Sequence, residues 1–232
     1  MRIAVIPARG GSKRIPRKNI RNFAGMPMIA HSIGLLKETQ VFDRIIVSTD
    51  DEEISNVAKH FGAEIPFIRD SSISDDYSGL QEVVADACTQ LHHDLDLTDQ
   101  VTCVLPCTPL LKRDDILKFL RISDKNPESF VFPITPLRIN PDRALVRKHE
   151  QTFEFKFPEF RFRRTQDFEQ LYMDSGQFYI ASASNWISNN LDDFKCEPME
   201  PWKTVDIDNF EDWNFAERLF LLSRQEIAGG EK

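Results

Sequence analysis

Residues 3–19 of this 232-residue chain read Ile3-Ala4-Val5-Ile6-Pro7-Ala8-Arg9-Gly10-Gly11-Ser12-Lys13-Arg14-Ile15-Pro16-Arg17-Lys18-Asn19. The apolar residues at the start of this stretch suit a strand in the interior of a sheet. The two glycines permit backbone conformations closed to other residues, and their amide groups can approach an anion closely. Because basic side chains follow at once, the strand leads into a loop that suits a phosphate group.

The basic residues are concentrated at the start of an acidic chain. The first acidic residue is Glu38, so residues 1–37 contain eight of the 29 Lys and Arg residues and no Asp or Glu. The rest of the chain therefore has 21 basic against 37 acidic side chains. A surface of that charge repels a nucleic-acid backbone, so we expect a small polyanion as the partner and no nucleic acid.

The loop matches neither of two well-known phosphate-binding motifs. A P-loop needs G-x-x-x-x-G-K-[ST], and a dinucleotide-binding fingerprint needs G-x-G-x-x-G. The spacing of Gly10-Gly11-Ser12-Lys13 fits neither, and an ordinary turn with solvated charges is the alternative. Six basic residues from Arg9 to Arg21, directly after the first strand, favour the phosphate site.

The loop also resembles a longer signature. Ala8-Arg9-Gly10-Gly11-Ser12-Lys13 followed by Lys18-Asn19 is similar to the pattern A-R-x-x-S-K-x-x-x-x-K-N of the acylneuraminate cytidylyltransferases, which make CMP-activated nonulosonic sugars. The resemblance extends to about residue 220 and implies that Arg9 and Lys13 are catalytic. It also implies that CTP is bound by Ala8, Arg9, Gly10, Gly11, Ser12, Lys13 and Asn19, with Arg69 and Ser78 near the cytosine base.

The order of apolar segments predicts an α/β fold. Strands are expected at 2–6, 44–48, 65–67, 101–105 and 129–134, and helices at 27–39, 51–61, 79–91 and 113–122. This alternation predicts a mostly parallel sheet with helices on both faces. The resemblance implies a single Rossmann-like nucleotidyltransferase domain over residues 1–232.

The alternation is interrupted by a segment rich in phenylalanine. Residues 153–157 read Phe-Glu-Phe-Lys-Phe, which predicts a strand with three rings on one face. Such a face needs a partner surface, either in the same domain or in another subunit. The resemblance implies a homodimer formed through an insertion at about residues 139–172.

A second group of charged residues lies near the C-terminus. In residues 203–208, Asp206 and Asp208 share one face of an extended segment, and two carboxylates suit Mg²⁺ beside a nucleotide. The alternative is a capping box of Asp208 and Glu211 before a helix at 210–222, which leaves Asp206 unexplained. The resemblance implies that both aspartates bind Mg²⁺.

The resemblance also identifies residues that surround the sugar. Segments 164–167 and 175–179 are similar to the family patterns R-x-Q-D and N-G-x-x-Y, which implies sugar-binding roles for Arg164, Gln166, Ser175, Gly176 and Tyr179. A planar guanidinium at position 164 suits the carboxylate of the sugar. Without the resemblance, Gly176 is a bulge glycine and Arg164 a surface residue.

Two departures indicate which sugar is used. Sialic and legionaminic acid enzymes usually have Gly where this chain has Arg14, and sialic acid enzymes have Q-P-T-S-P-L-R where residues 105–111 begin and end with Leu. Apolar groups leave the hydroxyls of a sialic acid tail unpaired, so pseudaminic acid fits better. Thr108 remains the candidate for binding sugar hydroxyls. Alternatives are legionaminic, N-acetylneuraminic or 3-deoxy-manno-octulosonic acid, or a non-catalytic CTP-binding module.

The implied reaction is attack of the sugar's anomeric 2-hydroxyl on the α-phosphorus of CTP, with release of pyrophosphate. The chain contains no long apolar run and no signal peptide, so we expect a cytoplasmic protein without a membrane partner. Its four cysteines form no C-x-x-C pair, which favours reduced thiols over zinc ligands or disulfides.

Overall fold

A computed structural model describes residues 1–74 and 78–229. In this part of the chain seven strands form one sheet, in which β10 is antiparallel to both of its neighbours. The remaining neighbours along the path β11-β6-β10-β5-β1-β4 are parallel, and β9 is added antiparallel to β6. The strands are β1 (Arg2–Pro7), β4 (Arg44–Ser48), β5 (Gln100–Val104), β6 (Phe130–Pro136), β9 (Tyr172–Asp174), β10 (Phe178–Ser182) and β11 (Phe194–Pro198).

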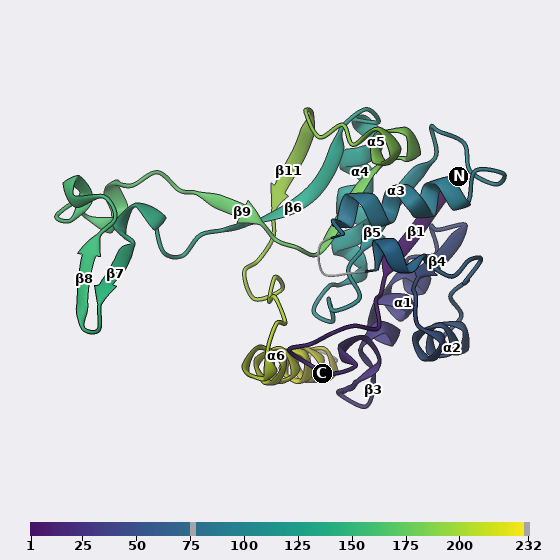
Figure 1. Ribbon diagram of the computed structural model, residues 1–232, viewed down its shortest axis with the longest axis horizontal. Helices are drawn as coiled ribbons and strands as arrows, with labels where there is room; N and C mark the ends of the chain where they lie inside the picture. The colour runs from purple at the N-terminus through teal and green to yellow at the C-terminus, as the bar shows by residue number, and fades with distance from the viewer. Residues whose placement is uncertain (75–77, 230–232) are drawn as a thin grey trace.

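Helices cover both faces of this sheet (Figure 1). They are α1 (Met28–Thr39), α2 (Glu52–His60), α3 (Leu80–Gln90), α4 (Arg113–Lys125), α5 (Ala183–Ser188) and α6 (Phe210–Gly229). The predicted α/β class is therefore confirmed. The expected strand at 65–67 is wrong: only a bridge between Ile46 and Glu64 forms there. The pattern did not predict β9, β10, α5 or β11.

Alternating side chains of β1 divide the core into two layers. Ala4 and Ile6 pack with α1, α2 and α4, whereas Ile3 and Val5 pack with α3 and α5 on the opposite face. This is the period of two that a strand buried on both faces requires. The sheet is thus fixed from both sides, and the loop that follows β1 emerges from a rigid strand.

A third apolar cluster holds the C-terminal helix against the start of the chain. It contains Ile15 from the basic loop, Phe23 from β2 (Asn22–Phe23), Ile207, and Trp213 and Phe220 from α6. The ring of Phe23 makes edge contacts with the rings of Trp213 and Phe220. The short strand β3 (Met26–Pro27) pairs with β2 and leads into α1. This cluster joins the two segments that carry the predicted chemistry.

Residues between β6 and β9 form an arm that projects from the body (Figure 1). Its hairpin consists of β7 (Leu145–His149) and β8 (Thr152–Phe155). The observed strand β8 begins one residue before the predicted strand at 153–157 and ends two residues before it. Phe160 contacts the rings of Phe157 and Phe168 inside the arm. Phe153 is 54% exposed and Phe162 is 83% exposed, so the arm carries uncovered apolar surface.

Two further expectations concern membranes and cysteines. Within the described ranges, no helix has both the length and the apolar character needed to cross a bilayer. All four cysteines lie in these ranges and carry free thiols, with Cys88 and Cys103 buried.

Candidate active site

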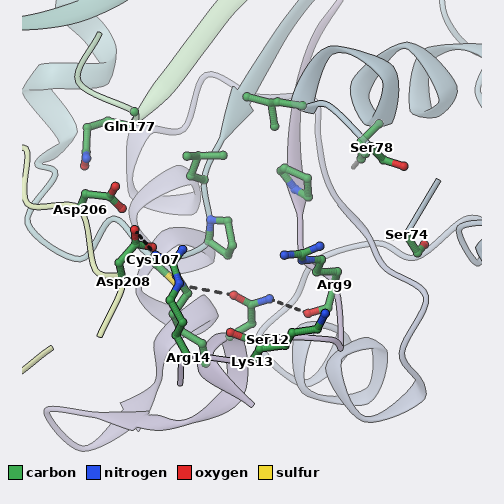
Figure 2. A pocket seen from close by; sticks show the side chains of 18 of the residues that line it. Arg9, Ser12, Lys13, Arg14, Ser74, Ser78, Cys107, Gln177, Asp206 and Asp208 are labelled. Atoms are coloured by element: carbon green, nitrogen blue, oxygen red, sulfur yellow. Dashed lines mark hydrogen bonds and ion pairs between the residues drawn. The ribbon is translucent and has the colours of Figure 1, made fainter. Parts of the chain in front are cut away.

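A cavity of about 500 Å³ opens where the strands β1 and β5 end. Its walls come from separate parts of the chain: the basic loop, residues 69–74 and 78–83, the turn after β5, the turn before β10, and residues 205–208. Ligands of open α/β sheets bind at the carboxyl ends of the strands, and this cavity has that position. Figure 2 shows Arg9, Lys13, Ser74 and Ser78 on one side and Asp206, Asp208 and Gln177 on the other.

Hydrogen bonds inside the protein hold the basic loop in shape. The side-chain amide of Asn19 donates to the carbonyl oxygen of Arg9 at 2.9 Å, and the backbone amide of Gly10 donates to Asp50 at 3.0 Å. A Cβ atom on Gly10 would lie 2.5 Å from a carboxylate oxygen of Asp51, whereas one on Gly11 would meet nothing within 4 Å. Gly10 is therefore required by close packing, and Gly11 is open to solvent.

Arg17 anchors the middle of the loop. Its backbone has a φ of 57°, and its guanidinium contacts both oxygens of Asp51 at 2.5 and 2.9 Å and Glu53 at 2.5 Å. Asp51 in turn accepts a hydrogen bond from the amide of Ile54 and caps α2. The guanidinium and this capping bond hold the pKa of Asp51 below its ordinary value. The loop is thereby fixed to the start of a helix.

Arg69 lines the same cavity as the basic loop. It is only 4% exposed, and its Nε donates to the hydroxyl of Ser74 at 3.0 Å, while a guanidinium nitrogen lies 3.7 Å from Asp50. Burial lowers the pKa of Arg69 from its ordinary value, and Asp50 opposes that effect. Both Arg69 and Ser78 line the cavity, as the predicted cytosine side requires.

The two aspartates face the basic loop. Asp206 and Asp208 line the cavity, and Arg14 contacts Asp208 at 2.7 Å. Although Asp206 is reached by solvent, the surrounding walls and the neighbouring Asp208 raise its pKa, which Lys18 and Arg14 partly offset. Two neighbouring carboxylates repel each other, and a cation bound beside both offsets that repulsion. Within residues 1–74 and 78–229, no group of three or more His, Cys, Asp or Glu residues suits a metal ion, so a metal here would complete its shell with substrate and water.

The segment before these aspartates is fixed by a buried ion pair. Lys203 is 8% exposed, and its ammonium group lies 2.8 Å from Asp115 and 3.1 Å from Glu200. Asp115 also accepts from the backbone amide of Lys112 at the start of α4. The pair therefore ties residues 200–203 to the helix that covers the sheet.

The predicted capping box is shifted by one residue. The side chain of Asn209 accepts from the amides of Glu211 and Asp212, and Asp212 accepts from the amides of Asp208 and Asn209. The capping pair is therefore Asn209 and Asp212, not Asp208 and Glu211. Capping does not account for the carboxylate of Asp208, which strengthens the case for a metal ligand.

Of the predicted sugar-binding residues, Gly176 lines the cavity, with a φ of 63° that favours glycine. Ser175 is buried and lies outside the cavity wall. Tyr179 donates to Asp174 at 2.7 Å, and Thr108 is buried and donates to the carbonyl oxygen of Leu105 at 3.0 Å. Thr108, Ser175 and Tyr179 therefore lie outside the lining of the cavity.

Arg164 and Gln166 lie on the arm. Arg164 forms two hydrogen bonds with Asp167, at 2.8 and 2.9 Å, and both Arg164 and Gln166 are exposed. Neither lines the cavity of its own chain. A single chain therefore does not bring this predicted pair to the site.

The two leucines used to predict the substrate have different positions. Leu105 lines the cavity, beside Pro106 and Cys107. Leu111 is 6% exposed and packs in the core with Ile116 and Phe119. The substrate argument therefore depends on Leu105.

Cys107 lies in the same turn. Burial raises the pKa of its thiol to about 12, so the thiol stays neutral, and its Sγ lies 3.5 Å from the side-chain oxygen of Asn19.

Two residues with a role at the site were not predicted from the sequence. Asp50 connects the amide of Gly10 with Arg69, and Gln177 lines the cavity while donating to the carbonyl oxygen of Ser175 at 3.0 Å. The sequence shows Asp50 only as a residue before a helix. Gln177 sits at a variable position of the family pattern and carries no signal of its own.

An α/β sheet whose first loop is basic and faces two aspartates across a cavity is an arrangement that suits a nucleotidyltransferase. The comparison with known families agrees, because the model of the cytidylyltransferase family matches residues 3–221. The chain belongs to the cytidylyltransferase family and is a cytidylyltransferase.

Individual relatives extend this similarity over nearly the whole chain. A pseudaminic acid cytidylyltransferase of Campylobacter jejuni is 35% identical over 96% of this chain and 97% of its own. A CMP-N,N'-diacetyllegionaminic acid synthase of Legionella pneumophila is 32% identical over 97% of this chain and 98% of its own. A structure of CMP:2-keto-3-deoxy-manno-octonic acid synthetase in complex with CTP has a TM-score of 0.69 at 16% identity, covering 97% of this chain and 99% of its own, and shows the same fold.

Proposed function

We propose that this protein transfers CMP from CTP to the anomeric 2-hydroxyl of a nonulosonic acid, with pseudaminic acid as the preferred sugar, and releases pyrophosphate. The observation that carries the proposal is the meeting of the basic loop and the two aspartates in one cavity. The relatives that are named for pseudaminic and legionaminic acid support the same class of sugar. The product would serve the synthesis of a surface glycan or a modified flagellin.

The nucleotide occupies the side of the cavity lined by the basic loop. Arg9 and Lys13 hold the triphosphate, and Arg69 and Ser78 lie beside the base. The amides of Gly10 and Ser12 already donate to Asp50 and to the carbonyl oxygen of Gly10, so side chains of the loop make the phosphate contacts. Positive groups fixed in place before the substrate arrives stabilise the charge that develops as pyrophosphate leaves. The bonds of Asn19 and Arg17 keep the loop in this shape without CTP.

Asp206 and Asp208 hold the metal ion. Cytidylyltransferases of this kind generally use a divalent metal, and paired carboxylates beside a triphosphate fit Mg²⁺. A bound Mg²⁺ supplies charge neutralisation at the reacting phosphate. Lys18 and Lys203 hold the segment that carries these aspartates, through the carbonyl oxygen of Ile207 and through Asp115.

The sugar occupies the opposite side, near Gly176 and Leu105. An apolar wall at Leu105 offers no partner for the extra hydroxyls of a sialic acid tail, and it favours a sugar with a methyl or acyl group there. Legionaminic, N-acetylneuraminic and 3-deoxy-manno-octulosonic acid are the alternative substrates. Thr108, Ser175 and Tyr179 lie outside the cavity lining, so we expect their effect on the sugar to be indirect.

A homodimer formed through residues 139–172 explains the arm. It carries Leu145, Phe153 and Phe162, all more than half exposed. A second chain that covers this surface would bring Arg164 and Gln166 toward the sugar side of its partner's cavity. Changing Phe153 and Phe162 to Asp should give a monomer in sedimentation and reduce activity; an unchanged dimer would contradict the role of the arm.

We place the reaction in the cytoplasm, a reducing compartment that suits four free thiols.

The test is turnover with a panel of acid sugars. The purified protein is incubated with CTP, Mg²⁺ and pseudaminic, legionaminic, N-acetylneuraminic or 3-deoxy-manno-octulosonic acid, and pyrophosphate release and the CMP-sugar are measured. We expect the CMP-sugar of pseudaminic acid to form fastest. Formation of none of the four products would contradict the proposed function.

A further inference from the structure

Gln177 is a buried glutamine in the wall of the candidate active site. It lines the cavity although it is only 2% exposed. Its side-chain nitrogen donates to the carbonyl oxygen of Ser175 at 3.0 Å, which fixes the orientation of the amide. Its side-chain oxygen is buried and has no hydrogen-bond partner among the residues that the structure describes. A buried acceptor without a partner costs free energy, and in a cavity wall a ligand can supply the missing donor.

The neighbour of Gln177 across the sheet is Leu105. The backbone amide of Leu105 donates to the carbonyl oxygen of Gln177 at 3.0 Å, one position beyond the pairing of Phe178 with Val104. Residues that lie opposite each other in an antiparallel pair have their side chains on the same face of the sheet. Leu105 and Gln177 therefore place an apolar surface and one acceptor side by side in the cavity.

The side-chain oxygen of Gln177 needs a donor, which excludes most charged groups of the two substrates. The ionised phosphates of CTP and the carboxylate of the sugar present only acceptors. Figure 2 shows Gln177 across the cavity from Arg9, Lys13 and Ser78, the side proposed for the nucleotide. The donor is therefore a hydroxyl or an N–H group of the sugar.

The apolar neighbour decides between these two donors. A hydroxyl also has acceptor lone pairs, and Leu105 offers them no partner. The N–H of an acylamino group is only a donor, and the carbonyl oxygen of that group points away from the N–H. The alkyl part of the acyl group suits the surface of Leu105. One acceptor beside an apolar surface therefore matches an acylamino group better than a hydroxyl.

We propose that the side-chain oxygen of Gln177 accepts a hydrogen bond from the N–H of an acylamino group of the sugar, whose acyl group packs on Leu105. The inference rests on the proposed function and makes Gln177 a residue that determines specificity. The site then selects sugars that carry an acylamino group at this position over sugars that carry a hydroxyl there.

An amide-to-ester change in the sugar tests the contact in the wild-type protein. In two analogues of pseudaminic acid, one or the other acylamino group is replaced by an acyloxy group, which keeps the shape and removes the N–H. We expect at least one analogue to lose about 5- to 150-fold in kcat/KM, because the oxygen of Gln177 then meets another oxygen. The KM for CTP should stay unchanged.

Gln177→Met identifies the residue responsible. Methionine has a similar length but lacks the amide oxygen, so the variant should use pseudaminic acid less well and no longer discriminate against that analogue. Gln100→Met is the matched control. Gln100 also has a buried side-chain oxygen without a partner in the described part of the chain and donates to Ser123 at 2.9 Å, but it lies outside the cavity lining. Gln100→Met should keep the discrimination of the wild type.

The outcomes separate this inference from the proposed function. If the wild-type protein activates no acid sugar, the proposed function fails. If it prefers 3-deoxy-manno-octulosonic acid, which has no acylamino group, or uses both analogues as well as pseudaminic acid, the role of Gln177 is wrong. Discrimination that persists in Gln177→Met would assign the acylamino group to another residue and would also overturn the inference.

Discussion

The ammonium group of Lys18 donates a hydrogen bond to the carbonyl oxygen of Ile207 at 2.7 Å. The side chain of Ile207 is 2% exposed and packs in the same apolar cluster as Ile15. A polar and an apolar contact therefore join the basic loop to the aspartate segment, although 189 positions separate Lys18 from Ile207. One shared set of contacts therefore fixes the basic loop relative to the segment of Asp206 and Asp208.

The two glycines of the loop should respond differently to alanine. In Gly10→Ala the new Cβ atom would lie 2.5 Å from Asp51, so either the loop or Asp51 must move. Forced packing of this kind costs about 1 to 3 kcal/mol, and we expect a lower melting temperature and a higher KM for CTP. Gly11→Ala, which meets nothing within 4 Å, is the matched control and should stay within about 0.5 kcal/mol of wild type. Equal effects of both changes would contradict the packing argument.

Lys13→Ala should weaken the use of CTP without unfolding the protein. Lys13 is exposed and lines the cavity. Loss of its interaction with the triphosphate, about 1.5 to 3 kcal/mol, corresponds to a fall of about 10- to 150-fold in kcat/KM for CTP. Lys59, an exposed lysine on α2, provides the control. Kinetics of Lys13→Ala that match those of Lys59→Ala would show that the loop charges are only solvated.

Asp206→Asn and Asp208→Asn should lose most activity while keeping the wild-type melting temperature. Each change removes the charge of a proposed metal ligand, but neither touches the cap, which belongs to Asn209 and Asp212. The loss should be partly recovered at high Mg²⁺, and calorimetry with Mn²⁺ should show weaker binding.

The control for the aspartates is the cap itself. Asn209→Ala should destabilise the protein by about 1 kcal/mol and leave the Mg²⁺ dependence of the rate unchanged. Wild-type rates for Asp206→Asn at limiting Mg²⁺ would remove that residue from the metal site.

The pair of Arg17 and Asp51 should make stability depend on pH. The pKa of Asp51 lies below its ordinary value of 3.8 because Arg17 hydrogen-bonds to the charged form. Ionised Asp51 therefore stabilises the fold above that value, and the contribution is lost as the pH falls through the lower pKa of the folded state. We expect Asp51→Asn, which keeps a good cap, to be less stable than wild type near pH 7, with the difference in unfolding free energy shrinking below pH 3.8. A difference that stays constant with pH would exclude the charge of Asp51 as its cause.

Leu105 should control the choice between sugars. The wild-type protein should have a much higher kcat/KM for pseudaminic acid than for N-acetylneuraminic acid. Leu105→Gln offers a partner for sugar hydroxyls and should shift the ratio of the two kcat/KM values toward N-acetylneuraminic acid by about 2- to 10-fold. Leu97→Gln, at an exposed position outside the cavity lining, is the control. Equal turnover of both sugars by the wild type would contradict the role of Leu105.

The sequence predicted those parts of the site that lie close together in the chain. The basic loop could be identified because its strand, glycines and charges follow one another within seventeen residues, and Asp206 and Asp208 because they share one face of a short segment. The cap was misplaced by one residue because Asp208 and Asn209 are adjacent and both suit the start of a helix. Local chemistry does not distinguish them.

The remaining features depend on tertiary structure. The antiparallel placement of β10 follows from the arm, which reverses the chain before residue 178, and no local pattern encodes that reversal. The distance of Arg164 from the cavity has the same origin. Leu111 packs in the core and Leu105 lines the cavity. The sequence could not distinguish these two environments, because both residues are equally hydrophobic.

The order of the strands has a consequence for synthesis on the ribosome. The central strand β10 pairs with Val104 and its neighbours in β5 on one side and with β6 on the other, yet it is made after the whole arm. Until residues 178–182 leave the exit tunnel, β5 and β6 each present an unpaired edge, and the nascent chain cannot complete its sheet. Folding of this protein during translation must therefore wait for about three-quarters of the chain, and truncated products will expose strands prone to aggregation.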